Sequence, residues 1–258
     1  MKIVSWNVNG LRSPSMNIIK EKQFNQDCEL AKLIKKYDPD ILCLQETKCQ
    51  KKDEDPIFDI LPYNYSCWNS STEKLGYSGV SVLSKIPFQC IENKIVDDDK
   101  FGRILILEFE TFILINVYVP NSKDKDDYRK GWDIKMKELL ANNYNKPVVF
   151  CGDLNVVSDN MDIYNASILK RGNSPGTKDY ERANFKNLIS LGYTDVHRYL
   201  YPEDKLWTWW DYRSRARTKD NGWRLDYFLV ADEKIINSGS ICKEIYGSDH
   251  CPIYIKLN

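Results

Sequence analysis

The sequence lacks any uninterrupted apolar run approaching the roughly 18 residues that a transmembrane helix needs, so we expect no membrane span. It also lacks a charged segment followed by an apolar stretch near its start. Residues 1–4 run directly into a strand-like segment, which argues against a secretory signal. No repeat, low-complexity tract or linker divides the 258 residues, and we expect a single domain over residues 1–258. These absences favour an intracellular protein, cytoplasmic or, in a eukaryote, nuclear.

Zinc-site spacing is also missing, since no CxxC pair or cysteine–histidine cluster occurs. The eight cysteines are therefore expected to be reduced thiols. Cys43, Cys151 and Cys251 lie in or beside apolar runs, where small core residues are common. The formal net charge of zero argues neither for nor against a polyanionic partner. Apolar residues make up 42% of the chain, enough for a sizeable core.

Short apolar, β-branched runs recur along the chain and predict buried or half-buried strands. They cover residues 2–6, 40–44, 79–83, 103–108, 112–119, 147–151, 224–230 and 251–257. Helical spacing covers residues 17–36, 126–143 and 178–191. Residues 103–108 and 112–119 are too closely linked for a crossover helix, so they are predicted to form a hairpin. This mixture predicts two packed sheets with helices outside them.

Polar side chains stand at one end of most of these apolar runs. They are carboxylates, amides, a phenol and one of the two histidines: Asn7, Glu46, Tyr118, Asp153, Asn155, Asp226, Asp249 and His250. Each alone is more often a turn residue, but strand ends that meet at one edge would form a polar cleft. No serine or cysteine nucleophile is paired with a base. Oxygen ligands suit a hard cation such as Mg²⁺, which beside a carboxylate and an imidazole favours phosphodiester hydrolysis.

Seven short motifs also occur in order along the chain. They are SWNVNGLR at 5–12, LQETK at 44–48, GYSGV at 76–80, VYVPN at 117–121, CGDLNV at 151–156, GWRLDY at 222–227 and GSDHCPI at 247–253. Together they resemble the exonuclease III / AP endonuclease family of the endonuclease–exonuclease–phosphatase superfamily. The resemblance implies a four-layer α/β sandwich, in which two packed mixed β-sheets are flanked by helices.

The resemblance also implies roles for individual residues. The implied metal ligands, for Mg²⁺ with Mn²⁺ as a substitute, are Glu46, Asn7, Asp249, Asp153 and Asn155. The implied catalytic residues are Asp153, His250, Tyr118, Asn155 and Asp226. Asp226 is expected to orient His250, which would donate to the scissile phosphate. Asp153 is the preferred general base over Tyr118, because the reference pKa of Asp is about 4 and that of Tyr about 10.

Further residues are implied to contact DNA. Phosphate contacts are expected at Tyr77, Asn121 and Asn173. A pocket for a base-less sugar is expected between Trp209, Trp223 and Leu225, whereas Trp210 should lie in the core and His197 has no motif around it. Contacts to the duplex backbone are expected from Arg213, Arg215, Arg217 and Lys219. Two departures are that Asn9 stands where some relatives carry Asp, and that the loop 121–127 lacks the arginine that some relatives insert into DNA.

We therefore expect a monomeric, Mg²⁺-dependent DNA-repair phosphodiesterase. It should cut double-stranded DNA 5′ to abasic sites and show 3′→5′ exonuclease and 3′-end trimming activity. One alternative is a phosphatase of the same superfamily that acts on small or lipid phosphates, against which the aromatic pocket argues. The other is a nucleic-acid-binding protein without catalysis, against which the complete set of polar residues argues. The number of metal ions, the balance between endonuclease and exonuclease activity and the acceptance of uracil stay open.

Overall fold

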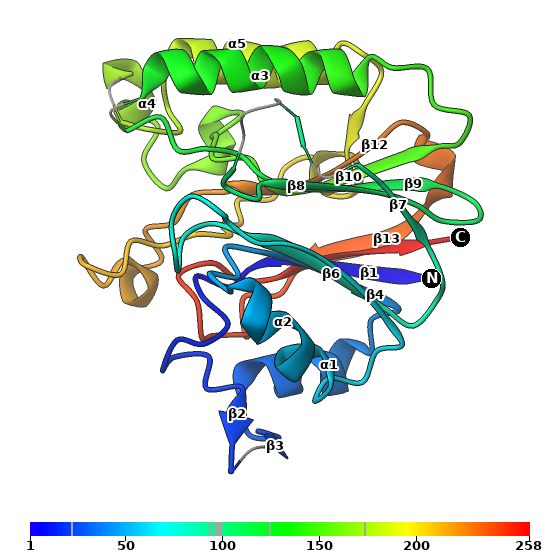
Figure 1. The fold of residues 1–258 in the computed structure, drawn as a ribbon. Coiled ribbons are helices and arrows are strands. Elements are labelled where there is room, and N and C mark those ends of the chain that lie inside the picture. The colour runs from blue at the N-terminus through cyan, green and yellow to red at the C-terminus, as the bar shows by residue number, and fades with distance from the viewer. Residues whose placement is uncertain (22, 93, 96–99, 124, 173) are drawn as a thin grey trace.

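Two six-stranded mixed sheets lie face to face at the centre of the protein (Figure 1). A computed structural model describes residues 1–21, 23–92, 94–95, 100–123, 125–172 and 174–258. Asn173, one of the expected phosphate contacts, lies outside these residues. Helices cover the outer face of each sheet, so the predicted four-layer sandwich is confirmed.

The first sheet has the strand order β13-β14-β1-β4-β6-β5. Its strands are β1 (Lys2–Asn7), β4 (Ile41–Gln45), β5 (Tyr65–Asn69), β6 (Val80–Ser84), β13 (Ile236–Ile241) and β14 (Ile253–Leu257). The central strand β1 runs parallel to β4 and antiparallel to β14. A parallel neighbour on one side places the carboxyl ends of β1 and β4 at the same edge.

The second sheet has the order β11-β12-β10-β9-β8-β7. Its strands are β7 (Gln89–Glu92), β8 (Ile104–Glu108), β9 (Ile113–Tyr118), β10 (Val148–Asp153), β11 (Thr194–Asp195) and β12 (Asp226–Val230). The antiparallel pairing of β8 with β9 confirms the predicted hairpin. Parallel pairing of β9 with β10 again brings two carboxyl ends to one edge.

Helices α1 and α2 cover the first sheet, and α3 and α5 cover the second (Figure 1). The helices are α1 (Glu29–Tyr37), α2 (Lys51–Phe58), α3 (Asp126–Leu140), α4 (Ser167–Arg171), α5 (Asp179–Ile189) and α6 (Val196–Leu200). Single 3₁₀ turns are η1 (Asn160–Asp162), η2 (Ala216–Lys219) and η3 (Glu233–Ile235). Within the described part of the chain, no helix combines the length and the apolar character that crossing a membrane requires.

The helix predicted over residues 17–36 is wrong in its first half. Residues of that half form a two-stranded ribbon, β2 (Ile19–Lys20) with β3 (Gln23–Phe24), and only α1 is helical. Residues 20–27 contain a single apolar side chain, Phe24, so no apolar face could bury a helix there. Asn25 donates a 2.8 Å side-chain hydrogen bond to the carbonyl of Asn17 and closes the ribbon instead.

A buried polar network joins the two sheets inside an otherwise apolar layer. Gln45 Nε2, on β4, donates to Asn116 Oδ1 on β9 at 2.7 Å. Asn116 Nδ2 donates in turn to the carbonyls of Leu44 and Ser81 in the first sheet, at 3.2 and 3.0 Å. Buried polar groups without partners are costly, so these bonds favour one register between the sheets.

The short helix α6 packs at the sheet edge formed by β11 and β12. The fully buried Arg224 binds two carboxylates there, with Nε 2.6 Å from Asp162 Oδ1 and Nη2 2.8 Å from Asp195 Oδ2. His197, in α6, lies close enough to Arg224 for the guanidinium charge to affect its pKa. Burial and the charge of Arg224 lower the pKa of His197 to about 4. The folded protein therefore favours a neutral His197.

His197 is expected to make folding sensitive to acid. Its folded pKa of about 4 lies below its ordinary value of 6.5, so its contribution is complete above pH 6.5. As the pH falls from 6.5 towards 4, the unfolded chain binds a proton that the folded protein rejects, and stability is lost. His197→Gln should therefore lose about 1 kcal/mol less free energy of unfolding between pH 7 and pH 5 than the native protein, measured in urea. Equal losses would contradict the role of His197.

Candidate active site

The polar strand ends meet at one edge of the sandwich. Asn7 ends β1, beside Gln45 at the end of β4. Asp153 ends β10 and is paired with Tyr118 at the end of β9 and with Asp226 at the start of β12. This register puts side chains from both sheets within reach of one another.

Asn7 links carboxylates that belong to different sheets. Its Nδ2 donates to Glu46 Oε1 at 3.1 Å and to Asp153 Oδ2 at 2.9 Å. Lys48 Nζ lies 3.1 Å from Glu46 Oε2. Burial disfavours the charge of Glu46, but Lys48 and the Asn7 amide outweigh burial and hold the pKa of Glu46 below its ordinary value. Glu46 is therefore an anion at this edge of the sandwich.

Asp153 is almost fully buried and accepts hydrogen bonds on both oxygens. The backbone N–H of Asn155 donates to Oδ1 at 2.9 Å, and Asn155 Nδ2 donates to Oδ2 at 3.2 Å. Burial raises the pKa of Asp153 above its ordinary value, and the negative charge of Asp226 adds to the shift against the opposing charge of His250. A carboxylate with a raised pKa is a stronger base than an exposed one.

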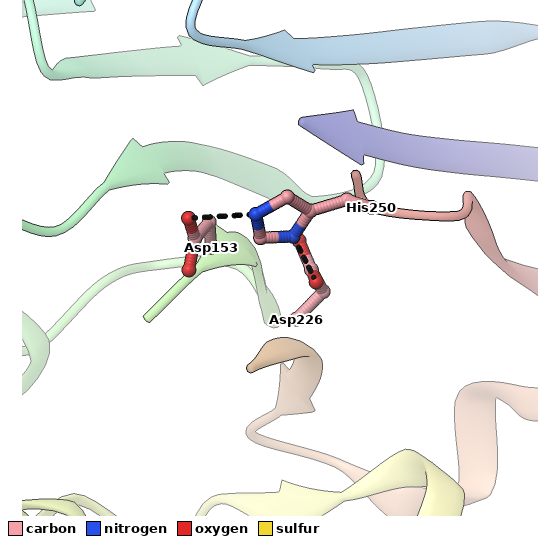
Figure 2. Close-up of side chains that lie close together, drawn as sticks. All are labelled: Asp153, Asp226 and His250. Atoms are coloured by element: carbon pink, nitrogen blue, oxygen red, sulfur yellow. Dashed lines mark hydrogen bonds and ion pairs between the residues drawn. The ribbon is translucent and has the colours of Figure 1, made fainter. Parts of the chain in front are cut away.

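His250 lies between two carboxylates, as Figure 2 shows. Its Nδ1 is 2.8 Å from Asp226 Oδ2, and its Nε2 is 3.8 Å from Asp153 Oδ2. Burial alone would lower its pKa, but Asp226 and Asp153 outweigh burial and raise the pKa of His250 to about 10. The two carboxylates therefore favour the protonated imidazole, and Asp226 holds the ring in one orientation.

The site could hold a metal ion. Asp153, Asp226 and His250 each offer a ligand atom, and these atoms lie within 4.8 Å of one another. However, a protonated His250 bound to Asp226 is a poor ligand, because metal binding needs a free nitrogen lone pair. The carboxylates of Glu46 and Asp153 fit a hard cation better, since one amide binds both and oxygen ligands suit such ions.

Asp249 lies beside this group and has its own partners. Asn9 Nδ2 donates to Oδ1 at 2.9 Å, and Trp209 Nε1 donates to Oδ2 at 3.1 Å. Lys48 Nζ also donates to Asn9 Oδ1. Both oxygens of Asp249 therefore have donors, and it belongs to a neighbouring cluster rather than to the Glu46–Asp153 pair.

Tyr118 and Tyr77 lie around a buried arginine. The guanidinium carbon of Arg103 is 4.8 Å from the centre of the Tyr118 ring, and Nη2 donates to the Tyr77 hydroxyl at 3.1 Å. Burial and the charge of Glu46 raise the pKa of Tyr118 well above its ordinary value. The Tyr118 phenol therefore keeps its proton at neutral pH.

Asn121 extends the site along the loop after β9. Its Nδ2 donates to Asn155 Oδ1 at 3.2 Å, so these amides, both expected in the site, are in contact. Asn121 is exposed and Asn155 is buried. This hydrogen-bonded pair connects Asn121 at the surface with Asp153, to which Asn155 donates.

The tryptophans divide between the core, where Trp210 was expected, and a less buried cluster. Trp207 and Trp210 are buried in the core between the sheets. Trp209 and Trp223 are only half-buried and meet edge to face at 5.3 Å between ring centres. They pack with Leu225 in a small apolar cluster separate from the core. The hydrogen bond from Trp209 to Asp249 joins this cluster to the polar site.

The basic loop after Trp210 contains two kinds of arginine. Arg213 and Arg215 are exposed, as a role in contacting a partner requires. Arg217 instead donates 2.7 Å hydrogen bonds to the carbonyls of Lys243 and Ile245, and its guanidinium carbon lies 4.6 Å from the centre of the Trp210 ring. Arg217 therefore holds the loop that precedes Asp249. Its position in an alternating basic run did not indicate this structural role.

Known proteins resemble this chain over its length. The Endonuclease/Exonuclease/phosphatase family model matches residues 4–250. The chain belongs to this family. It is 38% identical to an exodeoxyribonuclease of Bacillus subtilis (strain 168) over 268 residues, covering 100% of both chains. It is 39% identical to the DNA repair nuclease APEX1 of Danio rerio over 269 residues, covering 100% of this chain and 82% of that one.

A solved structure gives the same result. The crystal structure of the AP endonuclease LMAP from Leishmania major superposes with a TM-score of 0.84 at 26% identity, covering 100% of this chain and 87% of that one. The family resemblance inferred from the motifs is therefore confirmed, and so is the fold that it implied.

This member of the family has site residues that the sequence did not indicate. Lys48 pairs with Glu46, but a lysine after a strand is usually a surface residue. Arg103 begins an apolar run and is buried. The only sign of its role in the sequence is a single charge at the start of a predicted buried strand. Arg129 and Asp133 have the spacing of an exposed helical ion pair, yet both are buried. Burial of a charge depends on what packs over it, which local spacing does not show.

His250 and Asp226 are expected to act as a unit. His250→Asn and Asp226→Asn should each reduce the single-turnover rate of DNA cleavage by about 10²–10⁴-fold, the usual value of positioned acid–base groups. Because one residue works through the other, the double variant should be no slower than the slower single variant. His197→Gln, which changes the other histidine, is the control and should keep the native rate at pH 7. A double variant whose loss is the product of the single losses would show independent action.

Proposed function

We propose that this protein is a metal-dependent DNA-repair phosphodiesterase that cuts duplex DNA 5′ to abasic sites. Trimming of blocked 3′ ends and 3′→5′ exonuclease activity are part of the proposal. The observation that carries it is the His250 imidazole, bound through Nδ1 to Asp226 at 2.8 Å and facing Asp153 with Nε2 at 3.8 Å. A proton donor and a basic carboxylate next to each other suit the attack of water on a phosphodiester.

The protein's own residues supply the proton transfers. Asp153 accepts a proton from the attacking water, which Asn155 helps to orient from the same loop. His250 donates through Nε2 to a phosphate oxygen, while Asp226 keeps its ring in place. Tyr118 keeps its proton and donates a hydrogen bond to the phosphate or to the leaving oxygen. Its raised pKa supports Asp153 rather than Tyr118 as the general base.

Glu46, Asn7 and Asp153 are the proposed ligands of Mg²⁺, for which Mn²⁺ can substitute. Asn155, which donates to Asp153, and Asp249, in the neighbouring cluster, are proposed as further ligands. A bound cation would neutralise phosphate charge and favour the ionised form of Asp153. The match between two anionic carboxylates and a hard cation supports this assignment.

The remaining candidate residues are proposed to contact DNA. We propose that Trp209, Trp223 and Leu225 enclose a base-less sugar, and that Tyr77 and Asn121 bind phosphate. Arg213 and Arg215 are proposed to contact the duplex backbone. We also propose that residues 1–258 act as one catalytic domain and as a monomer. An intracellular location follows from a genomic substrate and agrees with eight free cysteine thiols.

A panel of labelled duplexes tests the function. The substrates carry an abasic analogue, a uracil, a recessed 3′ end or a blocked 3′ end, each assayed with Mg²⁺ and with EDTA. We expect incision 5′ to the abasic analogue that EDTA abolishes. Glu46→Ala should raise the Mg²⁺ concentration required, because a carboxylate ligand is lost, whereas Glu110→Ala, at an exposed carboxylate between β8 and β9, should not.

Several results of this panel would contradict the proposal. Full cleavage in excess EDTA would exclude the metal requirement. Hydrolysis of small or lipid phosphates without cleavage of any duplex would favour a phosphatase. Binding of duplexes without cleavage in either Mg²⁺ or Mn²⁺ would favour a binding protein.

Trp223 is expected to contribute to selectivity for abasic sites. An intact nucleotide is too bulky for a sugar-sized pocket and must first break its stacking and pairing, at a cost of about a few kcal/mol. Trp223→Ala should widen the pocket, so cleavage at abasic sites should fall modestly and cleavage beside uracil should fall less or rise. The measurement is the ratio of single-turnover rates on the two duplexes. Trp68→Ala, at a half-buried tryptophan on β5, is the control. An unchanged ratio in Trp223→Ala would remove Trp223 from the pocket.

A further inference from the structure

A buried arginine lies behind the loops that carry Asn121 and Asn155. Arg129 is in the first turn of α3, on the outer side of the second sheet, and only 2% of its surface is exposed. It touches none of the groups proposed to react. Its contacts are with the backbone that holds them.

The guanidinium donates to both loops at once. Nη1 lies 2.9 Å from the carbonyl oxygen of Pro120, after β9, and 3.2 Å from that of Asn155, after β10. Nη2 lies 3.1 Å from the carbonyl oxygen of Leu154. Buried carbonyls need donors, and carbonyls in loops cannot obtain them from a neighbouring strand. One side chain therefore sets the distance between the loops.

The guanidinium is itself held from behind. Its Nε donates to Asp133 Oδ1 at 2.8 Å, one turn further along α3. Glu181 Oε1, on α5, lies 3.7 Å from Nη1, and Asn184 donates to Asp133 Oδ2 at 3.0 Å. A buried cation must be paired, so these partners keep Arg129 in one orientation.

The loop conformation matters because Asn155 has a backbone φ of +47°. Asparagine tolerates this left-handed region better than most residues other than glycine, and hydrogen bonds from the surroundings hold it there. In that conformation the N–H and the side chain of Asn155 both donate to Asp153. Asn155 Nδ2 also donates to the carbonyl of Val119 at 3.0 Å. A change in the Asn155 backbone would therefore move donors away from Asp153.

We propose that Arg129 is a positioning residue for the cleavage reaction, which holds Asn155 in the conformation that supplies hydrogen bonds to Asp153. The inference rests on the proposed nuclease function. It requires an arginine, because the planar guanidinium directs five N–H groups to several sides at once. The single ammonium of a lysine cannot reach Asp133 and both loops together.

The test compares Arg129→Lys with Met136→Ala. Met136 is buried in the same helix and packs in the apolar layer under the second sheet, so its truncation serves as a control for loss of stability. Arg129→Lys should lower kcat on an abasic duplex about 10- to 100-fold with little change in KM, as small misplacements of catalytic groups do. It should also shift the backbone amide resonance of Asn155. Met136→Ala should keep the native kcat and resonance despite a lower melting temperature.

Asp133→Asn provides a second variant if Arg129→Lys does not fold. It keeps the guanidinium and its carbonyl contacts but removes the charged partner, so a smaller loss of kcat is expected. A folded Arg129→Lys with native kcat and an unmoved Asn155 resonance would overturn the proposal, as would an equal loss of kcat in Met136→Ala. If the native protein cleaves no duplex, the proposed function fails. The Asn155 resonance then still decides whether Arg129 holds the loop.

Discussion

The site depends on the contact between Asn7 and two carboxylates. Asn7 ends the central strand of the first sheet, yet its amide binds Asp153 from the second sheet as well as Glu46 from its own. The carboxylates of buried Asp153 and half-buried Glu46 would otherwise repel each other across the interface between the sheets. A donor placed between them reduces that repulsion and fixes their separation. The same two hydrogen bonds of Asn7 therefore fix both the packing of the sheets and the geometry of the site.

Charge is arranged in alternation around this contact. The carboxylates of Asp153 and Asp226 flank the His250 imidazole. Lys48 forms an ion pair with Glu46 at the outer edge of the site. Neighbours of opposite charge outweigh the burial penalty at Glu46 and His250, whereas at Asp153 burial still raises the pKa. Removing one member would leave a buried charge in the array without its partner.

The outer layers support the same edge from a distance. Arg129 and Arg224 are both buried and both paired with carboxylates, and each holds a segment next to a site residue. Arg129 holds the loop of Asn155, and Arg224 lies two positions before Asp226. The helices over the second sheet therefore do more than cover apolar surface, since their polar residues fix the loops at the strand ends.

Much of this could be predicted because it is local. Strands β1, β4, β9, β10 and β12 are mostly apolar runs with a polar residue at one end, and both features can be read from neighbouring positions. Strands such as β7 could not, because β7 is exposed along its length and has no apolar pattern. The helix over residues 17–36 was predicted wrongly because apolar residues at its two ends were joined across a polar gap.

By itself, the sequence determined which residues carry chemistry and at which strand ends they stand. Seven motifs in order identified the family, and their carboxylates, amides and histidine defined the type of site. Only the tertiary structure decided which of them touch: Asn7 with Asp153, 146 positions apart, and Trp209 with Asp249. It also decided that Arg129, Arg103 and Arg217 turn inward. Hydrogen-bond partners and burial depend on segments distant in the chain, and no spacing within one segment contains that information.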